Sequence, residues 1–104
     1  MSQRLSSRPE ALEQRKVVRL YQTVGCQVWT TSQPFRAALS PGIPDLIVFH
    51  RRAMWFHETK APKGKQSPEQ LQFQRAADRC GVRYVLGGEA EAKKLLQAMG
   101  VLAA

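Results

Sequence analysis

The sequence predicts an α/β fold in which a central, mixed four-stranded sheet is flanked by helices. Apolar residues recur at helical spacing in three segments of the chain, a pattern typical of helices that bury one face. Short apolar runs of strand length lie between these segments, and such alternation favours an α/β core. With 104 residues and 43% hydrophobic content, the chain has room for a single core, and we expect residues 1–104 to form one domain.

The first predicted helix begins at Pro9, because proline is favoured in the first helical turn. From there apolar residues recur at helical spacing, and Gly25 supplies the C-terminal stop. Residues 1–8 are polar and basic, and we expect them to be flexible. Residues 26–31 are predicted to form the first strand, and residues 32–42 a long loop.

Two further strands are predicted around a turn at residues 50–52. The run LIVF that begins at Leu46 is typical of a strand that is buried on both faces. The next strand is AMWFHETK, residues 53–60, in which successive side chains point to opposite faces. Glu58 and Lys60 therefore share one face.

The second half of the chain predicts a helix, a strand and a final helix. A basic loop at residues 61–66 leads to Ser67 and Gln70, which form a capping box. That motif predicts a helix start and accounts for both residues by structure alone. Residues 82–86 are predicted as the fourth strand and residues 89–99 as the last helix.

The strand ends carry residues with the chemistry of a metal-dependent phosphodiesterase. If the two central strands pair as a hairpin, Asp45 lies beside Glu58. Two carboxylates and the carbonyl of Thr59 make a hard-oxygen site suited to Mg²⁺ or Mn²⁺. The ammonium of Lys60 can orient or deprotonate a water for in-line attack on phosphorus. The alternative is that Glu58 and Lys60 form a same-face pair on a solvated strand, since loose patterns arise often by chance.

In this context the chain resembles the PD-(D/E)XK nuclease superfamily and, within it, a small stand-alone VRR-Nuc domain of the phage and bacterial type. Pro44 and Asp45 match the PD of the family motif, and Glu58, Thr59 and Lys60 match its ExK. The resemblance implies a restriction-endonuclease-like core for the predicted α/β fold.

The resemblance extends into two helices. Ser67 and Gln70 match the family's S-x-x-Q, and Glu10 falls at its first-helix glutamate, with Glu13 as the alternative. The match covers roughly residues 9–88, in the family's order.

Three sets of site residues follow from the motif and its resemblance. The implied catalytic residues are Asp45, Glu58, Lys60, Gln70 and Glu10. The implied ligands of Mg²⁺ or Mn²⁺ are Asp45, Glu58, Glu10 and the carbonyl of Thr59, and no organic cofactor is expected. The expected nucleic-acid contacts are Lys63, Lys65, Arg36 and Ser67.

The resemblance implies a homodimeric, metal-dependent endonuclease that cleaves branched DNA such as Holliday junctions or flaps. Composition points in the same direction, because 16 basic residues against 8 acidic ones give a net charge of +8, which favours a polyanionic partner. One alternative is a restriction-type nuclease on simple duplex or on RNA. Another is a non-catalytic nucleic-acid-binding module, which has no reason to keep a carboxylate pair where phosphate must approach.

No stretch approaches the roughly 20 apolar residues of a membrane span, and the N-terminus lacks a signal-peptide pattern. We therefore expect a cytoplasmic protein, in a bacterial or phage-infected cell. Cys26 and Cys80 are expected to be buried, reduced thiols. Trp29 and Trp55 are expected to lie in the core, with base stacking near a groove as the alternative. A set of C-terminal apolar residues is expected either to form a dimer interface or to cover the sheet: Leu95, Leu96, Met99, Val101 and Leu102.

Overall fold

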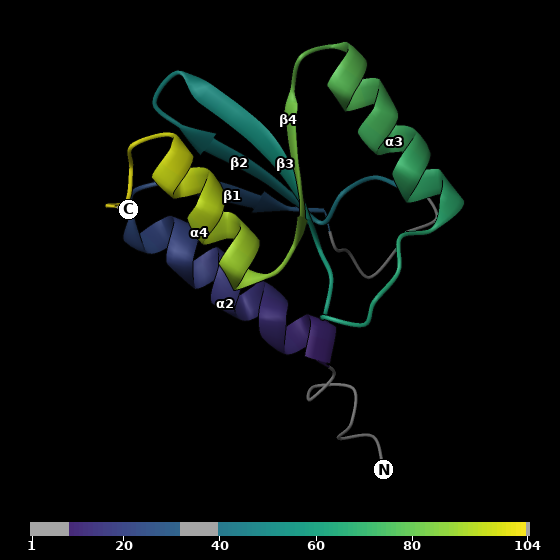
Figure 1. Ribbon diagram of the computed structural model, residues 1–104, viewed down its shortest axis with the longest axis horizontal. Coiled ribbons are helices and arrows are strands. Elements are labelled where there is room, and N and C mark those ends of the chain that lie inside the picture. The colour runs from purple at the N-terminus through teal and green to yellow at the C-terminus, as the bar shows by residue number, and fades with distance from the viewer. Residues whose placement is uncertain (1–8, 32–39, 104) are drawn as a thin grey trace.

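The computed structural model describes residues 9–31 and 40–103 and shows a four-stranded sheet between helices (Figure 1). The elements in chain order are α2 (Pro9–Thr23), β1 (Gln27–Thr30), β2 (Leu46–His50), β3 (Ala53–Thr59), α3 (Pro68–Arg79), β4 (Arg83–Gly87) and α4 (Glu89–Ala98). This confirms the predicted α/β class and the predicted order of elements. The flexibility expected for residues 1–8 and the contact expected from Arg36 lie outside the described residues.

The sheet is mixed, with strand order β1-β2-β3-β4. The first three strands pair antiparallel, and β4 joins β3 in parallel through the crossover helix α3. In the hairpin of β2 and β3, Leu46 pairs with His57. Continuing that register by one residue sets Asp45 opposite Glu58, at the open end of the hairpin.

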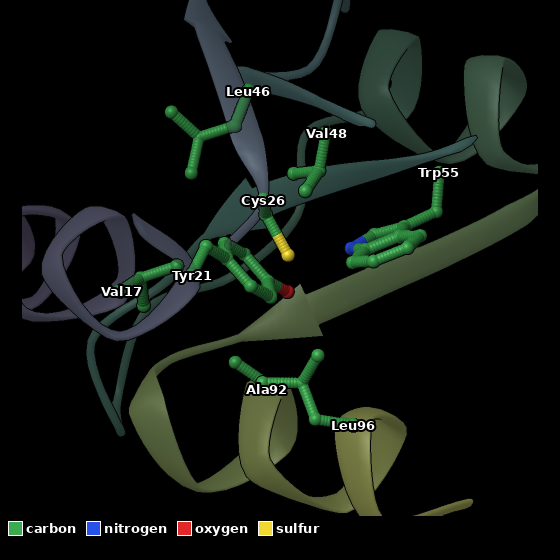
Figure 2. Close-up of a cluster of buried hydrophobic side chains, with 8 residues drawn as sticks. All are labelled: Val17, Tyr21, Cys26, Leu46, Val48, Trp55, Ala92 and Leu96. Atoms are coloured by element: carbon green, nitrogen blue, oxygen red, sulfur yellow. The ribbon is translucent and has the colours of Figure 1, made fainter. Parts of the chain in front are cut away.

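One face of the sheet packs against α2 and α4, which lie side by side (Figure 1). Figure 2 shows the side chains that converge there: Val17, Tyr21, Cys26, Leu46, Val48, Trp55, Ala92 and Leu96. Tyr21 meets Trp55 edge to face, with ring centroids 5.6 Å apart. Trp55 is fully buried, as predicted. This core fixes α2 against the sheet, and thereby fixes where its first turn lies.

The opposite face is covered by α3 over β3 and β4. Phe73 of α3 packs on Phe56, with ring centroids 5.0 Å apart, and on Tyr84, at 6.2 Å. On the same face, Trp29 of β1 is 58% exposed and Phe49 of β2 is 39% exposed. The predictions that β2 is buried on both faces and that Trp29 lies in the core are therefore wrong, because α3 does not cover this part of the sheet.

The two cysteines differ in environment, although both are free thiols. Cys26 is buried as predicted, whereas Cys80 is exposed, because it follows the last turn of α3. The C-terminal apolar residues serve the core: Leu96 belongs to it, and Leu95, Met99, Val101 and Leu102 pack against it. Their position supports the alternative in which they cover the sheet. No helix in the described ranges is long and apolar enough to cross a membrane.

Candidate metal centre

Three carboxylates from three parts of the fold meet at one end of the sheet. Glu10 in the first turn of α2, Asp45 just before β2 and Glu58 near the end of β3 each offer an oxygen, and these oxygens lie within 4.8 Å of one another. Glu58 is only 1% exposed, and the other two are half-buried. Of the two glutamates considered in the first helix, Glu10 lies in this cluster, whereas Glu13 contacts the start of α4.

Backbone hydrogen bonds hold the two strand carboxylates across the hairpin. The Asp45 N–H donates to Oε1 of Glu58 at 3.2 Å, and the Thr59 N–H donates to Oδ2 of Asp45 at 3.0 Å. On its other side, Asp45 accepts at its carbonyl from the Thr31 N–H, at 2.9 Å. The pairing of three strands therefore fixes the carboxylate of Asp45 beside that of Glu58, as the sequence predicted.

The chain before Asp45 is pressed against the first turn of α3. Gly42 has a φ of +88°, and a Cβ placed there would overlap the backbone of Glu69. Only glycine combines this left-handed conformation with so close a backbone approach. Gly42 thus allows α3 to begin next to the carboxylates.

The side chain of Gln70 links that helix start to the cluster. Its Oε1 accepts from the Ser67 N–H at 2.8 Å, and the Ser67 Oγ accepts from the Gln70 N–H at 3.1 Å, which completes a capping box. At the same time Gln70 Nε2 donates to Oε2 of Glu58 at 2.9 Å. The structural and functional interpretations of Gln70 are therefore compatible, because one amide makes both contacts.

Lys60 approaches the same oxygen from the other side. Its Nζ lies 3.8 Å from Oε2 of Glu58, and its side chain is 14% exposed. Its backbone N–H donates to the carbonyl of Gly87 at 3.1 Å, where β3 and β4 end together. Lys60 is thus anchored by the sheet and placed beside the carboxylates.

Two features of the Glu58 environment favour opposite protonation states of its carboxyl group. Burial raises its pKa to about 7, the charge of Asp45 adds to the rise, and Lys60 opposes it. Yet both of its oxygens accept hydrogen bonds from N–H groups, which is the arrangement that suits an ionised carboxylate. A buried anion beside two other carboxylates is costly unless positive charge meets it.

The donor set fits a hard divalent cation. Carboxylate oxygens are the ligands that Mg²⁺ and Mn²⁺ prefer, and Glu10, Asp45 and Glu58 supply three of them. The backbone N–H of Thr59 donates to one of these ligands, Asp45. A cation at this point would resolve the conflict at Glu58.

His57 lies on the other face of β3 and takes no part in the cluster. Its Nδ1 lies 2.7 Å from the Tyr21 hydroxyl, and its Nε2 lies 3.0 Å from the Gly87 carbonyl. A carbonyl can only accept, so Nε2 carries the proton and Nδ1 accepts from Tyr21. His57 is fully buried, so it packs inside the protein.

The fold and the cluster can be compared with known proteins. No family model and no curated protein matches the chain. Its structure is similar to a solved structure described as a VRR_NUC domain, with a TM-score of 0.73 and 25% sequence identity, and the match covers 86% of this chain and 95% of that one. The chain has the fold of a VRR_NUC domain. The family resemblance predicted from the motifs is confirmed, and the match supports a nuclease-family domain.

Within this VRR_NUC fold, the structure brings five of the predicted site residues into one group: Glu10, Asp45, Glu58, Lys60 and Gln70. Thr59 lies against the group through its backbone N–H. Lys63 and Lys65 are exposed in the loop that follows β3. Ser67 is half-buried, and its hydroxyl is used by the helix cap.

Two acidic residues near this cluster were not singled out from the sequence for what they do here. Glu13 Oε2 accepts from the Glu89 N–H at 2.7 Å, and Glu91 Oε1 accepts from the Gly88 N–H at 2.8 Å. Glu91 follows Gly88 by three residues, which is capping-box spacing and is a signal in the sequence. The partner of Glu13 lies 76 positions away, so only the packing of α2 on α4 brings the two together.

Proposed function

We propose that this chain is a metal-dependent, structure-specific DNA endonuclease that hydrolyses phosphodiester bonds at branched DNA such as Holliday junctions or flaps. The observation that carries the proposal is the group of three carboxylates around a buried Glu58, with the Lys60 ammonium 3.8 Å away. A purely structural cluster has no reason to gather three like charges at one buried point. The proposed setting is the cytoplasm of a bacterial or phage-infected cell.

Glu10, Asp45 and Glu58 would hold Mg²⁺ or Mn²⁺, with the carbonyl of Thr59 as a further oxygen ligand. When bound, such a cation supplies positive charge that attracts the scissile phosphate and stabilises the charge that develops on its oxygens. The hydrogen bonds from Asp45 and Gln70 to Glu58 keep its two oxygens oriented for this task.

Lys60 acts on the water that attacks phosphorus. It orients that water and offsets negative charge as the new phosphorus–oxygen bond forms. The bond from phosphorus to the leaving sugar oxygen breaks, and that oxygen takes a proton, so one water is consumed for each nick. Gln70 positions Glu58 for this reaction through its hydrogen bond of 2.9 Å.

Phosphate contacts are assigned to the basic loop after β3. Lys63 and Lys65 are exposed there, a few residues beyond Lys60, and they would attract the sugar–phosphate backbone towards the carboxylates. Ser67, at the end of the same loop, and Arg36 are proposed to add further backbone contacts.

Branched DNA and a homodimer are proposed together. One cluster of three carboxylates nicks one strand at a time. Resolution of a four-way junction, however, needs paired nicks across the branch. Two copies in a closed two-fold dimer, the commonest oligomer, would match the symmetry of the junction.

The decisive experiment is a panel of end-labelled substrates: single strand, duplex, flap, four-way junction and RNA. Each is incubated with Mg²⁺, with Mn²⁺ or with a chelator, and Lys60→Ala is run alongside. The proposal expects metal-dependent, symmetric nicks in the junction or cleavage of the flap, and twice the 11.7 kDa chain mass by light scattering. Equal cleavage of linear duplex or RNA by a monomer would support the restriction-type alternative, and absence of cleavage on every substrate would support the binding module.

A further inference from the structure

A hollow of about 500 Å³ opens beside Lys60. Its walls come from Glu13 of α2, from the loop after β3, and from the turn between β4 and α4 together with Glu91. Lys60 therefore contacts the carboxylate cluster at Glu58 and also lines this hollow. A group in the hollow would lie next to a phosphate at the cluster.

The lining of the hollow disfavours an anion. Among the lining residues in the described part of the chain, Lys60 is the one cation, and Glu13 and Glu91 are two carboxylates. The rest of the lining is small or apolar: Ala61, Pro62, Gly64, Leu86, Gly87, Gly88 and Ala90. A second phosphate would be repelled, whereas a flat, neutral group with N–H donors would find apolar walls and two acceptors.

The two carboxylates are fixed in place by the backbone at the start of α4. The Glu89 N–H holds Glu13 at 2.7 Å, and the Gly88 N–H holds Glu91 at 2.8 Å. A Cβ at Gly88 would overlap the carboxylate of Glu13, so glycine makes room for it. The bond from Gly88 also lowers the pKa of Glu91, which keeps it ionised and acceptor-only. A carboxylate has about four acceptor sites, so each can bind a ligand donor as well.

We propose that this hollow binds an unpaired nucleobase that carries an exocyclic amino group, and that this base belongs to the strand whose phosphate lies at the carboxylate cluster. This inference rests on the proposed function, because it takes the substrate to be a nucleic acid. Glutamate accepts well from the amino group of cytosine, while uracil presents a carbonyl at the same place. A base in a duplex is stacked and paired, so it must leave the stack to enter such a pocket. The single strand of a flap supplies such bases without unpairing a duplex.

The test compares two labelled oligonucleotides of equal length, one of deoxycytidine and one of deoxyuridine. Binding of the full chain is measured by fluorescence anisotropy at pH 8 with a chelator, so that no turnover occurs. The hollow predicts that the deoxycytidine strand binds about tenfold more tightly, the effect of one hydrogen bond to a charged group. Glu91→Gln keeps an oxygen for the Gly88 N–H and should bring the two affinities close together, whereas the control Asp78→Asn, which removes an exposed charge on α3, should leave the ratio unchanged.

A second variant keeps the proposal testable if Glu91→Gln unfolds. Ala90→Trp fills the hollow from an exposed position at the start of α4 and should abolish the preference, while Ala98→Trp at the other end of the helix should not. Equal binding of the two strands by the unmodified chain, or a preference that survives both Glu91→Gln and Ala90→Trp, overturns the inference. The binding experiment and the substrate panel together separate the two proposals. Cleavage without a preference for deoxycytidine refutes only base binding in the hollow. A preference for deoxycytidine without cleavage of any substrate refutes only the nuclease activity.

Discussion

His57 and Glu58 are neighbours in β3, and both are ionisable and buried, yet their surroundings shift them in opposite directions. Burial lowers the pKa of His57 to about 4, so its ring is neutral at physiological pH. Burial, helped by Asp45, raises the pKa of Glu58 to about 7. Consecutive strand residues point to opposite faces, so one residue of sequence separates a position inside the core from a position at the carboxylate cluster.

The difference lies in what the chain supplies to each side chain. His57 receives a partner at both ring nitrogens, from Tyr21 and from Gly87. Glu58 receives N–H donors at both oxygens and has the Lys60 ammonium at 3.8 Å, but two further carboxylates lie within 4.8 Å of it. Both ring nitrogens of His57 are therefore satisfied by neutral partners, whereas Glu58 belongs to a group of three like charges. In our account, that grouping of like charges is what recruits the metal.

The largest expected effect comes from removing the side chain of Asp45, Glu58 or Lys60. Asp45→Ala, Glu58→Ala and Lys60→Ala should each lower the rate of metal-dependent cleavage by at least about 10³-fold, because each removes charge or orientation at the scissile phosphate. Single-turnover rates on the preferred substrate provide the measurement, and circular dichroism checks that the fold is intact. Metal-dependent cleavage retained by all three purified variants would sink the site assignment.

How much of this site is readable from the sequence depends on how local each contact is. The hairpin register and the capping box are set by residues close in the chain, so the proximity of Asp45 to Glu58 and the start of α3 could be predicted. The choice of Glu10 over Glu13 could not, because the two share a helix face and the docking of α2 decides between them. The exposure of Trp29 was missed for a similar reason, since it depends on where α3 lies over the sheet.

In metal-free protein, a change of pH should alter the stability contributions of Glu58 and His57 in opposite directions. The pKa of Glu58 is raised on folding from 4.5 to about 7, so its contribution to stability is full below pH 4.5 and is lost as pH rises through 7. The pKa of His57 is lowered from 6.5 to about 4, so its contribution is full above pH 6.5 and is lost as pH falls through 4. The two contributions oppose each other between pH 4.5 and 6.5.

The measurement for this prediction is the difference in stability between the unmodified chain and Glu58→Gln, with a chelator, from pH 4.5 to 8. The unmodified chain should lose stability relative to Glu58→Gln as pH rises through this range, by on the order of 3 kcal/mol. A difference that does not vary with pH would mean that Glu58 titrates as an ordinary carboxylate and that the proposed conflict is absent.

The smallest effect on cleavage is expected from removing the hydrogen-bond donor of His57. Tyr21→Phe removes one hydroxyl, keeps the ring against Trp55, and leaves the Nδ1 of His57 buried without its donor. The free energy of unfolding in urea should fall by about 1–3 kcal/mol, while the cleavage rate of the folded protein should stay within a few-fold of the unmodified chain. A loss of cleavage as large as that of Glu58→Ala would show that the two faces do not act separately.

Direct titration with Mn²⁺ tests the central claim, that the carboxylate cluster is completed by a divalent cation. Electron paramagnetic resonance of free Mn²⁺ reports binding without any DNA or turnover. The unmodified chain should bind Mn²⁺, Glu58→Gln should weaken that binding by at least about tenfold, and Asp78→Asn, which removes a carboxylate remote from the cluster, should bind as the unmodified chain does. Binding of equal strength in the unmodified chain and Glu58→Gln, or no binding at millimolar Mn²⁺, would contradict the account.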